Sequence, residues 1–191
     1  MSDLKTKSGD LRVRRTALLI EKAFVDLLHE RDFQSITVQA IADRAMVNRA
    51  TFYAHFSDKY MLFERLILGM MRQTFESRLP ATLPYSRDNL ELLIVTVCEF
   101  VAQVDERCRQ GAVPGLPPFE EKIVEFLSEL LLTWLRDIRV GYSPDSLRLV
   151  ANVASWAIYG AANQWRVQKH SGSVREFAAQ VVPSISALVE K

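Results

Sequence analysis

The stretch QSITVQAIADRAMVNRATFYAHFSDK, residues 34–59, decides the fold of this chain. Its order of polar and apolar residues predicts two short helices that are joined by a tight turn. Thr37 can cap the first helix, because its side-chain oxygen can accept a hydrogen bond from a backbone N–H two or three residues later. Asn48 is an equally suitable N-cap for the second helix, which we expect to run to about His55.

The second helix has one apolar face and one polar face. Phe52 and Phe56 are four residues apart and therefore lie on the same side as core anchors. Ile41 and Ala42 of the first helix face inward as well. The outward side of the second helix consists of hydrogen-bond donors and small residues: Arg49, Ala50, Thr51, Tyr53 and His55. A short amphipathic helix of this kind after a tight turn predicts a helix-turn-helix arrangement.

The rest of the chain has helical periodicity. Between Asp10 and Leu79 there is no proline and only one glycine, whereas later clusters of both residues mark breaks between helices. We expect Ile138 to end a buried stripe and Pro183 to kink the last helix. No alternating run predicts a strand, so the predicted fold class is all-α. Apolar residues recur every three or four positions in a first helix that contains Val13 and in the segments 58–79, 88–106, 118–139, 144–169 and 173–190.

The composition restricts the classes of protein that remain. The 191 residues are 49% apolar and carry a formal charge of +1, which excludes global disorder and a uniformly basic nucleic-acid coat. The first 60 residues hold ten Lys and Arg against eight Asp and Glu, and the remainder fourteen against fifteen, so any nucleic-acid site must be local. No apolar leader is present, and no segment reaches the ~18 apolar residues of a membrane span. We therefore expect a soluble, cytoplasmic protein with no membrane partner.

The segment TVQAIADRAMVNRATFYAHFSDKYMLF, residues 37–63, resembles the N-terminal signature of the tetracycline-repressor (TetR/AcrR) family of transcription regulators. The signature has basic residues ahead of the first helix, and Arg14 and Arg15 fit it too, although the apolar repeat that begins at Val13 would include them in the helix. The resemblance implies a three-helix DNA-binding domain over residues 1–57 and a helical domain for effector binding and dimerisation over residues 58–191. It also implies a homodimer that represses transcription until a small molecule releases it from DNA.

One position departs from the family pattern. The family usually has glycine in the turn where this chain has Met46. If the backbone there needs a positive φ, a residue with a Cβ costs on the order of 1 kcal/mol or more. We therefore expect a turn that is present but mildly strained.

The resemblance implies that the second helix enters the major groove of a palindromic operator in double-stranded DNA. Arg49 is the leading candidate for reading a base, because a guanidinium group can bond to guanine O6 and N7 together. Ala50 and the methyl group of Thr51 can contact thymine methyl groups, and Gln39 can reach a base or a phosphate. Contacts to the DNA backbone are expected from Thr37, Tyr53, His55, Lys59, Arg14 and Arg15. Each of these residues has an alternative, an ordinary solvated or half-buried surface role.

The C-terminal helices provide candidates for the effector site and the dimer interface. The predicted pocket residues are Phe100, Phe126, Trp134, Trp156, Tyr159, Asn152 and Asn163, with Gln103 as a further polar candidate. Aromatic residues at helical spacing are more often plain core, which is the alternative for all of them. The small residues of the segment 144–169 suit a close helix contact in a dimer or within the monomer. The predicted effector is a small apolar or amphipathic molecule.

Other classes of function find little support. The chain has no phosphate-binding loop, no nucleophile motif and no metal-binding spacing, so we expect no enzyme activity, no cofactor and no metal. Cys98 and Cys108 as a redox pair and the glutamates of the segment 118–139 as a metal site are weak alternatives to core and solvated positions. The remaining alternatives are a transcriptional activator, a regulator that a partner protein controls, and a helical enzyme or carrier with a vestigial DNA-binding head.

Overall fold

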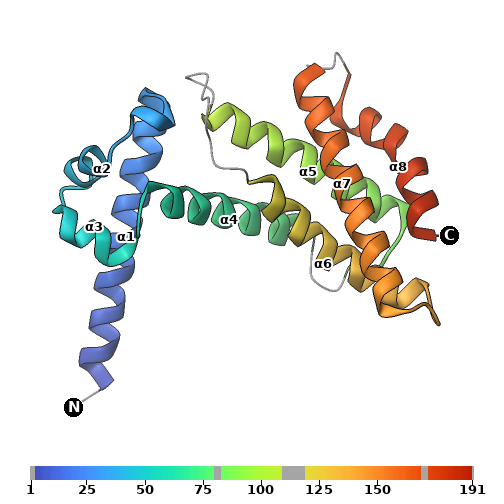
Figure 1. The fold of residues 1–191 in the computed structure, drawn as a ribbon, viewed down its shortest axis with the longest axis horizontal. Helices are drawn as coiled ribbons and strands as arrows, with labels where there is room; N and C mark the ends of the chain where they lie inside the picture. The colour runs from blue at the N-terminus through green and yellow to red at the C-terminus, as the bar shows by residue number, and fades with distance from the viewer. Residues whose placement is uncertain (1–2, 80–82, 109–118, 169–171, 191) are drawn as a thin grey trace. The chain divides into compact units, whose positions relative to one another are not determined.

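The computed structural model describes residues 3–79, 83–108, 119–168 and 172–190, and every regular element among them is helical (Figure 1). This confirms the predicted all-α class. The elements in chain order are α1 (Asp3–Glu30), the 3₁₀ helix η1 (Phe33–Ser35), α2 (Val38–Arg44), α3 (Arg49–His55), α4 (Lys59–Arg78), α5 (Arg87–Cys108), α6 (Glu120–Ile138), α7 (Pro144–Gln168) and α8 (Val174–Glu190). None of the described helices is both long enough and apolar enough to cross a lipid bilayer.

The helices form two compact units. One comprises the residues up to Ile67 together with the end of α5 from Asp105, and the other comprises Leu68–Val104 and the chain from Pro118 onward. The division therefore falls inside α4, some residues after the boundary that the sequence predicts at residue 58. The first half of α4 accordingly packs in the core of the N-terminal unit, where Leu62 and Phe63 are buried.

The N-terminal unit closes around a cluster of aromatic rings. The ring of Phe33, from η1, lies 6.1 Å from Phe24, 5.5 Å from Phe63 and 5.2 Å from Tyr60, in edge-to-face arrangements that favour aromatic pairs. α1 packs against α2, and α2 against α3. The prediction that Val13 joins this core is wrong, because its side chain is 55% exposed.

In the C-terminal unit α6 packs against α7, and α7 against α8. The buried side of α6 is the apolar stripe that the sequence predicts, but Ile138 at its end is 40% exposed. Several of the small residues of α7, among them Ala151, Ala154 and Ala162, are buried inside this unit. α8 runs on through Pro183 as one helix.

Two polar contacts attach the end of α8 to the rest of its unit. Arg87, the first residue of α5, forms an ion pair of 2.7 Å with Glu190, whose carboxylate also accepts a hydrogen bond of 2.8 Å from the hydroxyl of Tyr85. Arg139 donates to the backbone carbonyls of Leu188 and Val189 at 2.7 and 2.9 Å. Arg139 thereby bonds to two carbonyl groups in the last turn of α8, where the helix itself provides no partner.

Candidate nucleic-acid interface and effector pocket

Both predicted caps of the helix-turn-helix are present. The side chain of Thr37 accepts a hydrogen bond of 3.1 Å from the backbone N–H of Ala40, and that of Asn48 accepts one of 2.7 Å from Thr51. Each cap satisfies a backbone donor that the first turn of its helix leaves free. The two short helices therefore begin at the residues that the sequence predicts.

The turn between α2 and α3 is a Schellman motif. The backbone N–H of Met46 bonds to the carbonyl of Asp43 at 3.1 Å, and that of Val47 to Ala42 at 2.9 Å. In this motif the residue at the position of Met46 adopts the left-handed conformation, which glycine prefers. Met46 indeed has a φ of 55°, which confirms the expected strain at this turn.

The inner sides of α2 and α3 hold the two helices in a fixed relation. Ile41, Ala42, Phe52 and Phe56 are all buried, as predicted. The ring of Phe52 lies 5.8 Å from that of Phe56 and 5.6 Å from that of Tyr53. Because apolar packing fixes their inner faces, the outer faces of α2 and α3 are held in a defined orientation.

The outer face of α3 carries the predicted base-reading residues. Arg49, Ala50 and Tyr53 are exposed, whereas Thr51 and His55 are half-buried. Arg49 Nη2 donates a hydrogen bond of 3.2 Å to the hydroxyl of Tyr53, and the guanidinium lies 5.7 Å from the centre of the Tyr53 ring. One turn of helix separates the two residues, so Tyr53 restrains a side chain that would otherwise be free to adopt many rotamers.

The outer face of α2 carries a second pair of this kind. The amide Nε2 of Gln39 donates a hydrogen bond of 2.6 Å to Oδ1 of Asp43, and both residues are exposed. Thr37, at the start of the same helix, is exposed as well. The sequence prediction included Gln39 and Thr37 but not Asp43. The contact between Asp43 and Gln39 is seen only when the two residues are placed one turn apart on α2.

Lys59 has a different environment from the one that the sequence predicts. Its ammonium donates hydrogen bonds to the backbone carbonyls of Phe33, Gln34 and Ile36 at 2.9, 3.1 and 2.9 Å. Burial lowers the pKa of this group. Since an ammonium has three N–H donors, all of them are used inside the unit, where they fix η1 to the start of α4. We therefore do not include Lys59 among the proposed phosphate contacts.

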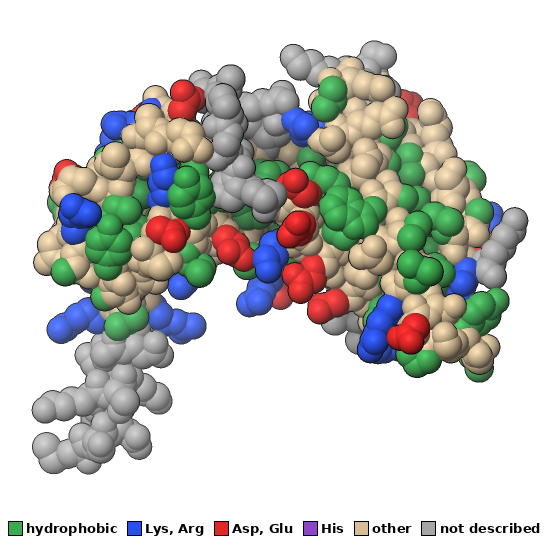
Figure 2. Space-filling view, viewed as in Figure 1, with side chains coloured by type: hydrophobic (Ala, Val, Ile, Leu, Met, Phe, Trp, Pro, Cys, Tyr) green, Lys and Arg blue, Asp and Glu red, His purple; other side chains and the backbone are tan. Residues whose placement is uncertain are grey.

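The basic residues near the N-terminus lie within a helix. Arg14 and Arg15 belong to α1, which begins at Asp3, so the prediction that they precede the first helix is wrong. Both are exposed, and Figure 2 shows Lys and Arg side chains projecting from both sides of this part of α1. Arg44, also basic, instead forms a two-pronged contact with Glu30 at 2.7 and 2.8 Å, which lowers the pKa of the Glu30 carboxyl.

Three of the seven predicted effector-pocket residues are part of the packed core. Phe100 and Trp134 are buried, and the rings of Phe100 and Phe126 lie 5.9 and 4.8 Å from that of Phe75. The indole N–H of Trp134 donates to the carbonyl of Leu83 at 2.7 Å. These three aromatic residues therefore have the core environment that was the alternative to a ligand box.

The polar candidates also have internal partners. The side-chain oxygen of Asn163 accepts hydrogen bonds from Arg166 at 2.7 and 3.1 Å. Tyr159 is half-buried, and burial raises its pKa. Trp165, which was not predicted, has a buried indole N–H with no hydrogen-bond partner among the described residues.

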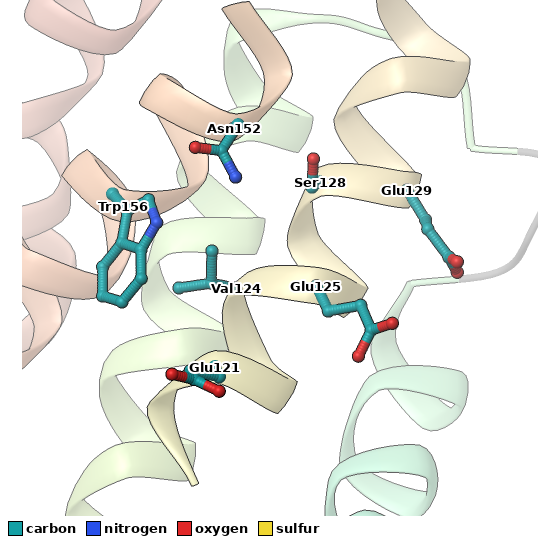
Figure 3. A pocket seen from close by; sticks show the side chains of 7 residues that line it. All are labelled: Glu121, Val124, Glu125, Ser128, Glu129, Asn152 and Trp156. Carbon is teal, nitrogen blue, oxygen red and sulfur yellow. The ribbon is translucent and has the colours of Figure 1, made fainter. Parts of the chain in front are cut away.

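Asn152 and Trp156 line an open groove of about 420 Å³ between α6 and α7 (Figure 3). The other lining residues are Glu121, Val124, Glu125, Ser128 and Glu129. Figure 2 shows acidic side chains gathered over α6, where these glutamates lie. The structure thus brings only two of the seven predicted pocket residues together in this groove.

Metal and thiol chemistry have no visible basis in the described residues. No group of three or more His, Cys, Asp or Glu side chains is placed there to hold a metal ion. Cys98 is buried, and burial raises its pKa to about 12, so its thiol is unreactive at neutral pH. The side chain of Cys108 lies outside the described part of the chain.

Residues 20–66 match the model of the family described as "Bacterial regulatory proteins, tetR family". Two relatives in Bacillus subtilis (strain 168) are uncharacterized HTH-type transcriptional regulators: YxbF, 41% identical over 33% of this chain, and YdeS, 36% identical over 40% of it. The aligned parts are only 17% and 37% of those proteins. A TetR transcriptional regulator from Streptococcus agalactiae 2603V has a similar fold, with a TM-score of 0.63, 19% identity, and coverage of 94% of this chain and 98% of that one.

These matches cover the capped helix-turn-helix and the helical C-terminal unit described above. The family is one of regulators and not of enzymes, as the sequence predicts. Residues 20–66, which contain the capped helix-turn-helix, are thus similar to the tetR family of bacterial regulatory proteins.

Proposed function

We propose that the chain is a sequence-specific DNA-binding regulator that works as a homodimer and leaves its operator when a small molecule binds. The observation that carries this proposal is the capped helix-turn-helix, whose outer faces expose Gln39, Arg49 and Ala50 above a packed inner side. A helix presented in this way fits the major groove of duplex DNA.

Different residues would contribute affinity and specificity. Arg49 has further N–H donors besides the one that bonds to Tyr53, and these can pair with guanine O6 and N7. The exposed Ala50 and half-buried Thr51 can contact thymine methyl groups. We expect phosphate contacts from Thr37, Tyr53, His55, Arg14 and Arg15. The guanidinium of Arg44 is already paired with Glu30, so we expect it to add little.

An uncovered apolar stripe on α7 supports the homodimer. Leu149, Val153, Trp156 and Val167 are exposed large apolar residues at helical spacing, with Gly160 between them. Exposed apolar side chains along one helix face mark a surface for protein contact, and the small Gly160 allows a second helix to approach closely. A second copy of this chain satisfies the two-fold symmetry that a palindromic operator requires.

Sedimentation velocity tests the dimer directly. Val153→Glu places a charge in the stripe and should convert a dimer of about twice the chain mass into a monomer. Arg148→Glu, on an exposed position of the same helix, is the matched control and should leave the dimer intact. A Val153→Glu variant that still sediments as a dimer would exclude this stripe as the interface.

The effector part of the proposal concerns the C-terminal unit. The groove at Asn152 and Trp156 is large enough for a small molecule. Its three glutamates favour an amphipathic ligand with a positive charge over a purely apolar one. Binding there would act on DNA by shifting the population between two arrangements of the DNA-binding units, with α4 as the connecting helix.

Selection from a randomised duplex library tests the DNA-binding function. The protein should enrich a two-fold symmetric sequence whose half-sites are about 34–36 Å, one helical turn, apart. A small molecule that raises the melting temperature should then weaken binding to the enriched duplex. Enrichment of no sequence would exclude specific DNA recognition, and a stabilising ligand without any effect on DNA affinity would exclude the effector mechanism.

A further inference from the structure

Asp43 is an acidic residue on the face of α2 that we propose to meet DNA. It lies one helical turn after Gln39, and its Oδ1 accepts the 2.6 Å hydrogen bond from Gln39 Nε2. Its own side chain makes no ion pair within the part of the chain that the structure describes. The neighbouring Arg44, which could have neutralised it, is held by Glu30 at 2.7 Å.

The carboxylate of Asp43 determines how the Gln39 amide is oriented. An ionised carboxylate has acceptors only, so it can bond to the NH₂ end of the amide but not to its oxygen. The Nε2 end of Gln39 therefore faces Asp43, while Oε1 and the second N–H remain free for another partner. One acceptor beside one donor is the pattern that complements adenine, which presents N7 as an acceptor and N6–H₂ as a donor in the major groove.

We propose that Asp43 is a positioning residue that fixes Gln39 as the reader of an A·T base pair in each half-site of the operator. This inference rests on the proposed DNA-binding function. Gln39 makes the contact with the base, and Asp43 acts through Gln39. The sequence motif does not reveal this role, because an exposed aspartate on a DNA-binding face repels phosphate and gives no direct contact.

The negative charge of Asp43 has a second consequence. A carboxylate near the DNA backbone weakens binding to every sequence equally, since phosphate contacts do not depend on the base. Asp43 therefore raises specificity in two ways, by orienting Gln39 and by reducing non-specific affinity. Asparagine separates these two effects only in part, because it loses the charge and keeps an acceptor oxygen but also has an NH₂ group that can donate to Gln39 Oε1.

The test compares full-length wild type, Gln39→Ala, Asp43→Ala and Asp43→Asn in selections from one duplex library that is randomised over about two helical turns. The wild type should enrich A·T at one position of each half-site. Gln39→Ala and Asp43→Ala should both lose that preference, by roughly fivefold or more, and keep the preferences at other positions. Asp43→Asn should keep only part of it, because the asparagine amide can bond to either end of the Gln39 amide. Both Asp43 variants should bind a random-sequence duplex roughly twofold more tightly than the wild type.

The possible outcomes distinguish a failure of the role proposed for Asp43 from a failure of the proposed DNA-binding function. If the wild type enriches a sequence and Asp43→Ala keeps the preference that Gln39→Ala loses, Asp43 does not position Gln39. If Asp43→Asn keeps the full preference of the wild type, an acceptor-only side chain is not needed to orient Gln39, which also overturns the proposal. If the wild type enriches nothing, the proposed function itself fails. Asp43 is exposed and lies in the last turn of α2, where removal of a negative charge does not weaken the helix, so both variants should fold.

Discussion

Met46 shows how a single residue can preserve a motif at a cost. It occupies the left-handed position of the Schellman turn with a φ of 55°, and its side chain is 89% exposed. Because the side chain is so exposed, its packing does little to offset the free-energy cost of the unfavourable backbone conformation. The family pattern of glycine at this position follows from the same physics, since glycine has no Cβ to clash in this region of φ.

Met46→Gly should stabilise the N-terminal unit by about 1 kcal/mol, because it relieves the left-handed strain at an exposed site. Urea unfolding measures the change. Gly141→Ala is the matched control, for which we expect a loss of stability instead of a gain. Gly141 has a φ of 91° and open space around it, so an added methyl group destabilises the fold only through the backbone conformation. An unchanged or lower stability for Met46→Gly would show that the Met46 side chain makes a stabilising contribution.

Arg49 and Tyr53 are a pair in which one side chain restrains the other. Arg49→Ala should abolish discrimination at one base pair, at a cost of about 1–3 kcal/mol, because a bidentate contact to guanine is lost. Tyr53→Phe keeps the ring and removes the hydroxyl that accepts from Arg49 at 3.2 Å, so it should reduce discrimination at the same base pair by a smaller amount.

Fluorescence anisotropy with duplexes that differ at that base pair measures both effects. Arg44→Ala serves as the control, because Arg44 is engaged with Glu30. If Tyr53→Phe weakens binding to all duplexes equally and leaves the discrimination at this base pair unchanged, its hydroxyl serves only the proposed phosphate contact and does not act through Arg49.

At the level of elements, the sequence predicts what local chemistry determines. The caps of α2 and α3, the apolar inner sides of both helices and the strained turn are properties of a few neighbouring residues, and all are confirmed. Contacts between residues far apart in the chain were not predictable. The carbonyls that bind Lys59 lie 23 to 26 residues before it, and Glu190 lies 103 residues after Arg87.

The apolar repeat in the sequence also did not predict where helices begin and end or how exposed their end residues are. Val13 and Ile138 follow the helical repeat, yet both are exposed, because periodicity gives the face of a helix and not the extent to which neighbours cover it. The pocket candidates Phe100 and Trp134 are buried in the core, and a related limit applies to them. Aromatic residues at helical spacing fit a packed core as well as a cavity, and the sequence does not distinguish the two.

Lys59→Met tests the function of the junction between η1 and α4. The variant keeps the length of the side chain but leaves three carbonyls without their charged donor, so we expect a loss of about 1–3 kcal/mol in unfolding free energy. The slope of log affinity against log salt should stay unchanged, because Lys59 makes no phosphate contact in our proposal.

Arg72→Met is the control for the loss of one positive charge from α4, since Arg72 makes only an exposed pair of 3.8 Å with Glu76. It should leave the unfolding free energy within a few tenths of a kcal/mol. Unchanged stability of Lys59→Met together with a salt slope that is lower by about one would restore the original prediction of a phosphate contact.

The contact between α5 and α8 predicts a dependence of stability on pH. The hydrogen bonds from Arg87 and Tyr85 hold the pKa of Glu190 at about 2, below its ordinary value of 4.5. The folded state therefore binds this proton more weakly than the unfolded state. The stabilisation is fully present above pH 4.5 and is lost as the pH falls towards about 2.

Urea unfolding between pH 2 and pH 6 measures this effect in the wild type and in Glu190→Gln. The amide variant should be less stable at pH 6 and should lose less stability on acidification, because it has no proton to take up. Glu129→Gln on the exposed side of α6 is the matched control. Parallel pH profiles for the wild type and Glu190→Gln would show that the ion pair with Arg87 does not contribute.

At the scale of the whole molecule, charge and function are divided along the chain. The net charge of +1 is a sum over two units of different character. The N-terminal unit has exposed arginines on α1 and α3, and the C-terminal unit has an acidic groove on α6. Because the total charge is near neutral, we expect weak non-specific attraction to DNA and propose that affinity comes from specific contacts made by two copies of the helix-turn-helix. This makes the proposed homodimer a requirement for tight binding.

The most direct test of the account is an anisotropy titration of the wild type, over a range of salt concentrations, against the duplex enriched from the library and against the same duplex with one half-site scrambled. We expect tight binding to the intact duplex and a large loss of affinity when one half-site is scrambled. The logarithm of the affinity should fall linearly with the logarithm of the salt concentration. Equal affinity for the two duplexes at physiological salt would contradict recognition by a paired helix-turn-helix.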